Sequence, residues 1–105
     1  MKYGLSDQVL DKIIQVFTGF SQVKEVFLYG SRAKGNYKKG SDIDLAIKGE
    51  NITISCLGKI RNALDELFLP YTIDLCIFGT IDNPALIDHI NRVGIVLYKV
   101  YTEAT

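Results

Sequence analysis

Apolar residues recur along the chain with two different spacings. A spacing of three and four residues, typical of a helix with one buried face, occurs in three segments. The first lies between Ser6 and Gly19, the second ends before Pro70, and the third lies between Asn83 and Gly94. Ser and Asn cap helix starts, whereas Gly and Pro end helices, so these residues set the expected helix limits. The second helix is predicted from the apolar positions Leu57, Ile60, Leu64, Leu67 and Phe68.

Four short segments are predicted as strands: residues 24–29, 42–48, 71–78 and 95–99. The second and third alternate strictly between apolar and polar positions, as half-buried strands do. The second predicted helix separates them, so we expect these two strands to run parallel in one sheet. The order of elements predicts an α/β fold, with helices packed on a small sheet.

Composition narrows the class of protein. The 105 residues, 48% of them hydrophobic, suit one domain spanning residues 1–105. Twelve basic residues balance twelve acidic ones, which argues against a purely electrostatic partner such as nucleic acid or an anionic membrane. Asp7 and Asp11 interrupt the first apolar segment, so no signal peptide is expected. Together with Cys56 and Cys76, expected as two buried reduced thiols, this predicts a cytoplasmic protein.

Three aspartates are the candidates for chemistry. Asp42 and Asp44 fall on one face of the strand 42–48, and their carboxylates can converge on a shared cation. Oxygen ligands select hard ions such as Mg²⁺ or Mn²⁺. The parallel crossover would bring Asp74 beside Asp44. Taken alone, however, an Asp-x-Asp pair is more typical of solvated residues on an open strand face.

The segment before the aspartates favours the site. Gly30 and Ser31 directly follow a strand and open a polar, glycine-rich turn, whose backbone N–H groups could bind a phosphate. A P-loop is excluded, because Asn36 and Tyr37 stand where its Lys and Ser or Thr are required. Positive charge for an anion is supplied by Arg32, Lys34, Lys38 and Lys39.

The combination of GSRAKG, then SDIDL, then TIDL resembles the minimal nucleotidyltransferase (MNT) family of the DNA polymerase β-like superfamily. The resemblance covers essentially the whole chain, and it implies a small α+β palm with a mixed sheet. Lys34 stands where the family often has Arg, which leaves the motif intact.

The resemblance also implies roles for the motif residues. Gly30 and Ser31 would hold a nucleoside triphosphate, with ATP as the expected donor. Asp42 and Asp44 would bind two Mg²⁺ ions, with Mn²⁺ as a substitute. Asp74 would bind one of these ions and could take the proton of the attacking hydroxyl.

Two further assignments follow for charged side chains outside the aspartates. Arg32 and Lys34 are candidates to offset phosphate charge, although solvated loop positions explain them equally well. For His89, which lies among the apolar residues of the last predicted helix, we expect a surface or structural role.

Proteins of this kind resemble the MNT half of MNT/HEPN toxin–antitoxin pairs, in which some members transfer AMP to a tyrosine of the HEPN protein. A HEPN partner is therefore the first expectation, because the palm accounts for all 105 residues and no acceptor domain is identified. Two alternatives stay open: a subunit that binds nucleotide and partner without turnover, and transfer to a small molecule such as an aminoglycoside. A homodimer through the edge strand 95–99 and the tail 101–105 also stays open.

Overall fold

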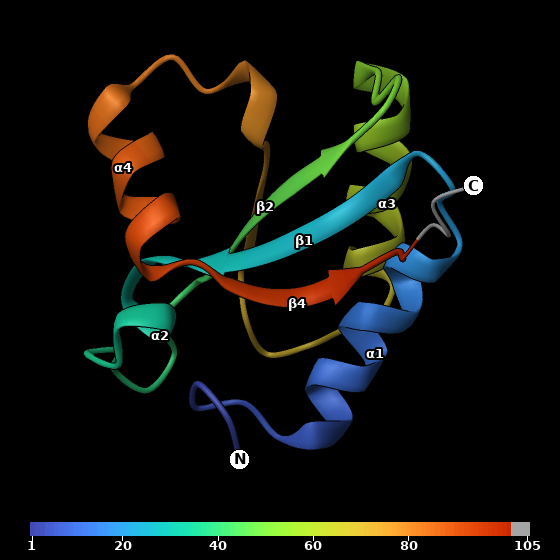
Figure 1. Ribbon diagram of the computed structural model, residues 1–105. Helices are drawn as coiled ribbons and strands as arrows, with labels where there is room; N and C mark the ends of the chain where they lie inside the picture. Colours follow the sequence, from blue (N-terminus) through green and yellow to red (C-terminus); the bar gives the residue numbers. More distant parts are fainter. Residues whose placement is uncertain (102–105) are drawn as a thin grey trace.

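The computed structural model describes residues 1–101 and contains a four-stranded sheet with helices on both faces (Figure 1). Along the chain the elements are α1 (Asp7–Thr18), β1 (Val23–Tyr29), α2 (Gly30–Lys34), β2 (Ile43–Gly49), α3 (Ile54–Asp65), β3 (Ile73–Ile77), the 3-10 turn η1 (Phe78–Thr80), α4 (Pro84–Val93) and β4 (Ile95–Lys99). The expected strands and long helices are all present. Among the described residues, none of the helices has both the length and the apolar character needed to cross a bilayer.

The sheet has the strand order β3-β2-β1-β4. Strand β1 pairs antiparallel with both β2 and β4, whereas β2 and β3 are parallel. The predicted parallel pairing is therefore confirmed, with α3 as its crossover. The two strands that carry the candidate aspartates, β2 and β3, thus begin at the same edge of the sheet.

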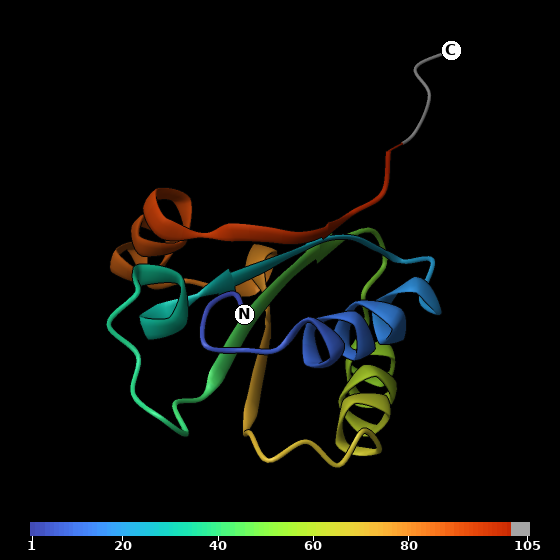
Figure 2. The same ribbon diagram turned by 90° about the horizontal axis from the view of Figure 1, so that it is seen from below.

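One face of the sheet is covered by α1 and α3 (Figure 2). The core between them is built from alternate residues of the central strands, such as Leu28, Ile43 and Leu45, which are fully buried. Helix α1 contributes Ile13 and Phe17 to the same core. Ser6 accepts a hydrogen bond from the Val9 N–H at 3.2 Å, which caps the start of α1 as predicted.

The opposite face is covered only in part, by α4. Ile90 of this helix packs with Tyr29 and Ala46 in a second, smaller apolar cluster. Asn83 caps α4 by accepting from the N–H groups of the two residues after Pro84, as the sequence predicts. Because Asp44 alternates with the buried Ile43 and Leu45, it lies on this incompletely covered face.

The second helix is shorter than the apolar spacing suggested. Helix α3 ends at Asp65, and the expected positions Leu67 and Phe68 lie beyond it. Phe68 adopts a left-handed φ of 52° and is 88% exposed. Pro70 disfavours helical geometry at Leu69, so a helix could not continue up to the proline, and the chain leaves α3 before the last expected positions.

The polar, glycine-rich turn after β1 begins with the short helix α2, which closes on the left-handed Gly35. One further local expectation needs correction. Cys76 is half-buried rather than buried, although Cys56 is buried and both thiols are free. Strand β4 is an edge strand as expected, but residues 102–105 of the tail lie outside the described part of the chain.

The buried face of β2 predicts a sharp stability effect. Ile43→Asp places an unpaired carboxylate in the core, which costs several kcal/mol of a total stability of about 5–15 kcal/mol. We expect this variant to lose its cooperative thermal transition, measured by circular dichroism. Ile54→Asp is the control, because Ile54 is 88% exposed at the start of α3. Equal behaviour of the two variants would contradict the assigned orientation of β2.

Candidate active site

The candidate site is centred on Asp44, in a central strand. Asp44 is paired in register with Tyr29 on β1 and with Asp74 on β3. Neighbouring strands lie about 4.8 Å apart, so the Asp44 and Asp74 side chains leave the sheet side by side. Asp42 stands one residue before β2 and is exposed, as is Asp74, whereas Asp44 is half-buried. The structure therefore brings the three predicted aspartates into one region.

The ionisation of Asp44 reflects this crowding. Burial is the main cause that raises the pKa of its carboxyl, and the charges of Asp74 and Asp42 raise it further. The guanidinium of Arg32 acts in the opposite direction. The site thus disfavours a charged Asp44 unless positive charge is added.

Gly30 lies directly against this carboxylate. Its φ is +75°, a left-handed conformation, and a Cβ atom built at this position would collide with the Asp44 carboxylate oxygen. Only glycine satisfies both the conformation and the close approach. The first residue of the GSRAKG motif is therefore determined by its neighbour on β2.

Tyr29, the register partner of Asp44 on β1, is buried beside it. Burial is the main cause that raises the pKa of its phenol, followed by the contact with Cys76 and the nearby carboxylates. Its hydroxyl lies 3.5 Å from the sulfur of Cys76, whose own thiol pKa is raised mainly by burial. Both groups are thus held neutral beside the aspartates.

Arg32 occupies a different place from the one expected. It is only 2% exposed, and it donates hydrogen bonds to the carbonyls of Ser41, at 2.8 and 3.1 Å, and Tyr3, at 2.9 Å. The rings of Tyr37 and Tyr71 lie within 5.4 and 5.0 Å of its guanidinium carbon. This geometry gives no support to direct phosphate binding by Arg32. It ties the entry of β2 to the N-terminal turn and adds positive charge near Asp44.

The other expected phosphate ligands are accessible. Ser31 is half-buried in the first turn of α2, immediately after Gly30, and Lys34 is exposed at the end of that helix. Their assignment to a nucleotide stays a prediction.

The donor set fits a hard divalent cation. The pKa of Asp44 is raised first by burial and then by the charges of Asp74 and Asp42, and a bound cation would offset the repulsion among these carboxylates. Within residues 1–101, however, no three acidic, thiol or imidazole side chains are already gathered as a finished set of metal ligands. Asp42, Asp44 and Asp74 would hold the ion after their side chains reorient.

Sequence comparison identifies the family of the chain. Residues 11–103 match the family model described as Polymerase beta, nucleotidyltransferase. The chain belongs to this family. All the candidate residues of this nucleotidyltransferase, from Gly30 to Asp74, lie inside the matched region.

A curated relative is the probable protein adenylyltransferase MntA of Haemophilus influenzae, which is 39% identical over 56 residues. That match covers 52% of this chain and 49% of the relative, so the chain aligns with about half of the relative's length.

Solved structures show the same fold at low sequence identity. A chain of a toxin–antitoxin complex with AMP-PNP superposes with a TM-score of 0.70 at 19% identity, covering 87% of this chain and 73% of that one. A chain of the tri-AMPylated Shewanella oneidensis HEPN toxin in complex with MNT antitoxin gives 0.67 at 16% identity, covering 91% and 74%.

Sequence reasoning missed one contact at the site of this nucleotidyltransferase. The N–H of Gly30 donates a hydrogen bond to Nε2 of His89, at 3.0 Å. The two residues are 59 positions apart, and no local pattern around His89 on α4 distinguishes it from a surface histidine. The structural role expected for His89 is thus found, but its partner is in the GSRAKG motif.

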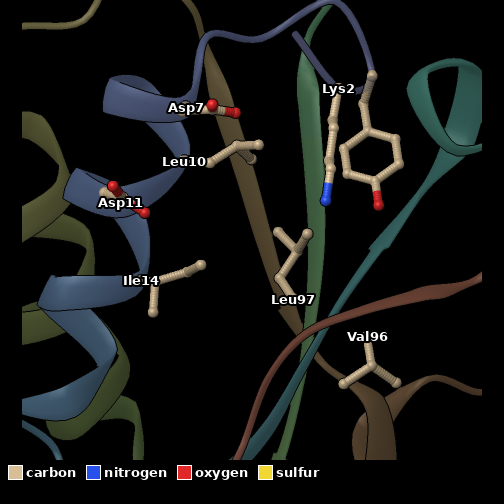
Figure 3. Close-up of a pocket in the computed structure, with 8 residues that line it drawn as sticks. Lys2, Asp7, Leu10, Asp11, Ile14, Val96 and Leu97 are labelled. Carbon is tan, nitrogen blue, oxygen red and sulfur yellow. The ribbon is translucent and has the colours of Figure 1, made fainter.

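A cavity of about 450 Å³ lies away from the aspartates, between α1, the N-terminal turn and β4 (Figure 3). Leu10 and Ile14 of α1 face Leu97 of β4 across it, and Asp7 and Asp11 stand at its rim. It contains none of the candidate residues, so this hollow is separate from the candidate active site.

The raised pKa of Asp44 predicts a pH-dependent gain in Asp44→Asn. Folding favours the neutral carboxyl, so the associated stability is present below the unfolded pKa and is lost as pH rises through the folded pKa. With divalent ions chelated, Asp44→Asn should melt above wild type at pH 7, and the gain should vanish toward pH 3. Asp11→Asn, an exposed change on α1, should stay within about 0.5 kcal/mol of wild type. A lower melting temperature of Asp44→Asn at pH 7 would contradict the carboxylate repulsion.

The close approach at Gly30 predicts a second stability effect. Gly30→Ala adds a Cβ against Asp44 and forces a left-handed alanine, which alone costs about 1–2 kcal/mol. The midpoint temperature of thermal unfolding should fall by about 4–8 °C for each kcal/mol of stability lost. Gly58→Ala is the matched control, because it lies within α3 with open space around it, and should gain up to about 1 kcal/mol. Unfolding of both variants at or above the wild-type temperature would remove the steric argument.

Proposed function

We propose that this chain transfers AMP from ATP to a tyrosine hydroxyl of a separate HEPN protein, in a reaction that depends on divalent cations. The observation that carries the proposal is the placement of Asp44 between Asp74 and the Gly30 turn. This puts candidate cation ligands and candidate phosphate ligands on one region of the sheet. The HEPN partner and the transfer of AMP to it are suggested by the protein adenylyltransferase relative and by the AMPylated HEPN complex with the same fold. The tyrosine acceptor is what the resemblance to MNT/HEPN pairs implies.

The transfer requires that the acceptor and the donor meet above the incompletely covered face of the sheet. The tyrosine oxygen attacks the α-phosphorus of ATP, and a new phosphorus–oxygen bond forms. The bond from the α-phosphorus to the bridging oxygen breaks, and pyrophosphate leaves with its electron pair. The chain's own residues bind the triphosphate through Ser31 and the turn after Gly30, with Lys34 offsetting its negative charge.

The proton of the acceptor hydroxyl needs a base near the attacking oxygen. Asp74 is exposed at the outer strand of the pair, and its carboxylate is the group that an incoming hydroxyl would reach from solvent. Asp44 is less suited, because it is half-buried against Gly30. Divalent cations bound by Asp42, Asp44 and Asp74 would lower the pKa of the attacking hydroxyl. They would also neutralise charge on the leaving pyrophosphate.

A labelling experiment tests the proposal. The chain is incubated with Mg²⁺, the protein encoded by the adjacent gene as the candidate HEPN partner, and ATP labelled either at the α- or at the γ-phosphate. We expect label on the HEPN protein from the α-labelled ATP alone, and its loss when the acceptor tyrosine is changed to Phe. Asp44→Asn should lower transfer by about 100-fold or more, because cation stabilisation is worth several kcal/mol. Asp11→Asn should transfer at the wild-type rate.

The outcomes separate the alternatives. A stable complex with bound nucleotide and no transferred label would leave a binding subunit without turnover. Label on an added aminoglycoside instead of the HEPN protein would identify a small-molecule acceptor. Label from γ-ATP would mean phosphoryl transfer and would contradict the proposed chemistry.

A further inference from the structure

The junction between β1 and α2 is attached to α4 through one hydrogen bond. The backbone N–H of Gly30 donates to Nε2 of His89 at 3.0 Å. The imidazole is half-buried and stands edge-on to the Tyr29 ring, with the ring centres 6.2 Å apart and an angle of 80° between their planes. Backbone, ring and imidazole therefore form one packed unit at the start of the GSRAKG segment.

This contact specifies the chemical state of His89. An imidazole nitrogen that accepts a hydrogen bond carries no proton, so the ring is neutral with its proton on Nδ1. Nε2 of His89 accepts from the Gly30 N–H, which is one of the first N–H groups of the short helix α2. These groups have no partner within the helix, so the imidazole provides one. The histidine thus acts through its lone pair and not through a positive charge.

Gly30 is restrained from two directions. The carboxylate of Asp44 occupies the space where a Cβ would stand, and Nε2 of His89 holds the N–H. The left-handed φ of +75° is kept between these two contacts. Because the Gly30 N–H is already used, a phosphate must be bound by the groups that follow, beginning at Ser31. Their direction depends on the conformation of Gly30.

We propose that His89 is a positioning residue for nucleotide binding: its Nε2 holds Gly30 in the left-handed conformation from which the backbone continues into Ser31 and α2. The nucleotide part of this inference rests on the proposed function. The positioning part stands on the hydrogen bond itself. It also gives α4 a role in the site, because this helix supplies the acceptor while its apolar side packs on Tyr29 and Ala46.

Two substitutions of His89 separate the hydrogen-bond acceptor from the ring, and a third variant is the control. His89→Gln retains a hydrogen-bond acceptor at a similar distance from the backbone, whereas His89→Phe keeps a ring and removes the acceptor. Arg92→Gln is the control on the same helix, where Arg92 pairs with Asp88 at 2.8 Å on an exposed surface. All are compared at one pH, by calorimetric titration with AMP-PNP and Mg²⁺. Amide exchange at Gly30 and the imidazole nitrogen signals, which are unambiguous because His89 is the single histidine, are measured by NMR.

We expect wild type to show a protected Gly30 amide and a proton on Nδ1. His89→Phe should lose the amide protection and bind AMP-PNP about tenfold more weakly, as for a donor left without a partner. His89→Gln should restore both to within about threefold, and Arg92→Gln should match wild type. Loss of affinity without rescue by Gln, or wild-type affinity in the Phe variant, would overturn the proposal.

The same measurements distinguish this inference from the proposed function. If wild type binds no AMP-PNP while the Gly30 amide is protected in a His89-dependent way, nucleotide transfer fails and the positioning of Gly30 stands. If the Gly30 amide exchanges equally fast in wild type and His89→Phe, the positioning fails whatever the nucleotide affinity is.

Discussion

The carboxylate of Asp44 stands on a strand whose other face is fully buried, between the phenol of Tyr29 and the carboxylate of Asp74. A strand register cannot slip by one residue without exchanging these faces, so the apolar residues Ile43 and Leu45 hold Asp44 in place. The rest of the site follows from this arrangement. Gly30 is required by the carboxylate beside it, and Asp74 is brought alongside by the parallel crossover through α3.

A buried guanidinium is the second constraint. Arg32 has no carboxylate as a direct ion-pair partner in residues 1–101, and its charge is instead stabilised by the carbonyls of Ser41 and Tyr3 and by two tyrosine rings. It joins three parts of the chain that are distant in sequence: the N-terminal turn, α2 and the entry of β2. Its field also lowers the cost of ionising Asp44. The residue expected to bind phosphate thus contributes to the site by holding its frame.

The parts of the fold that could be predicted are those encoded by local spacing. Alternation placed Asp44 opposite the buried face of its strand, and the intervening helix made the β2–β3 pair parallel. Glycine and serine after a strand indicated the turn that meets Asp44.

What could not be predicted depends on long-range contacts or on competition between local preferences. The bond between Gly30 and His89 joins elements that are adjacent only after the sheet has formed. Arg32 packs against the ring of Tyr71, a residue that follows α3 in the sequence and is therefore distant from Arg32 along the chain. The apolar position of Phe68 fitted the helical spacing, but α3 ends at Asp65 and the Phe68 ring is exposed. The sequence thus indicated the candidate site residues better than it indicated the contacts that hold them in position.

The two faces of the sheet differ in their residues: one holds the large apolar core, and the other carries the candidate site. The face covered by α1 and α3 buries the large aliphatic side chains, and its apolar contacts can offset repulsion elsewhere. The face covered in part by α4 retains a half-buried carboxylate beside two others, an arrangement that opposes folding when no cation is bound. A cation that binds only the folded state would reverse this effect, because its binding free energy adds to the stability of the fold. The same repulsion that weakens the free protein would therefore favour binding of a cation, and α4, which covers part of this face, also supplies the imidazole that accepts the hydrogen bond from the neighbouring turn.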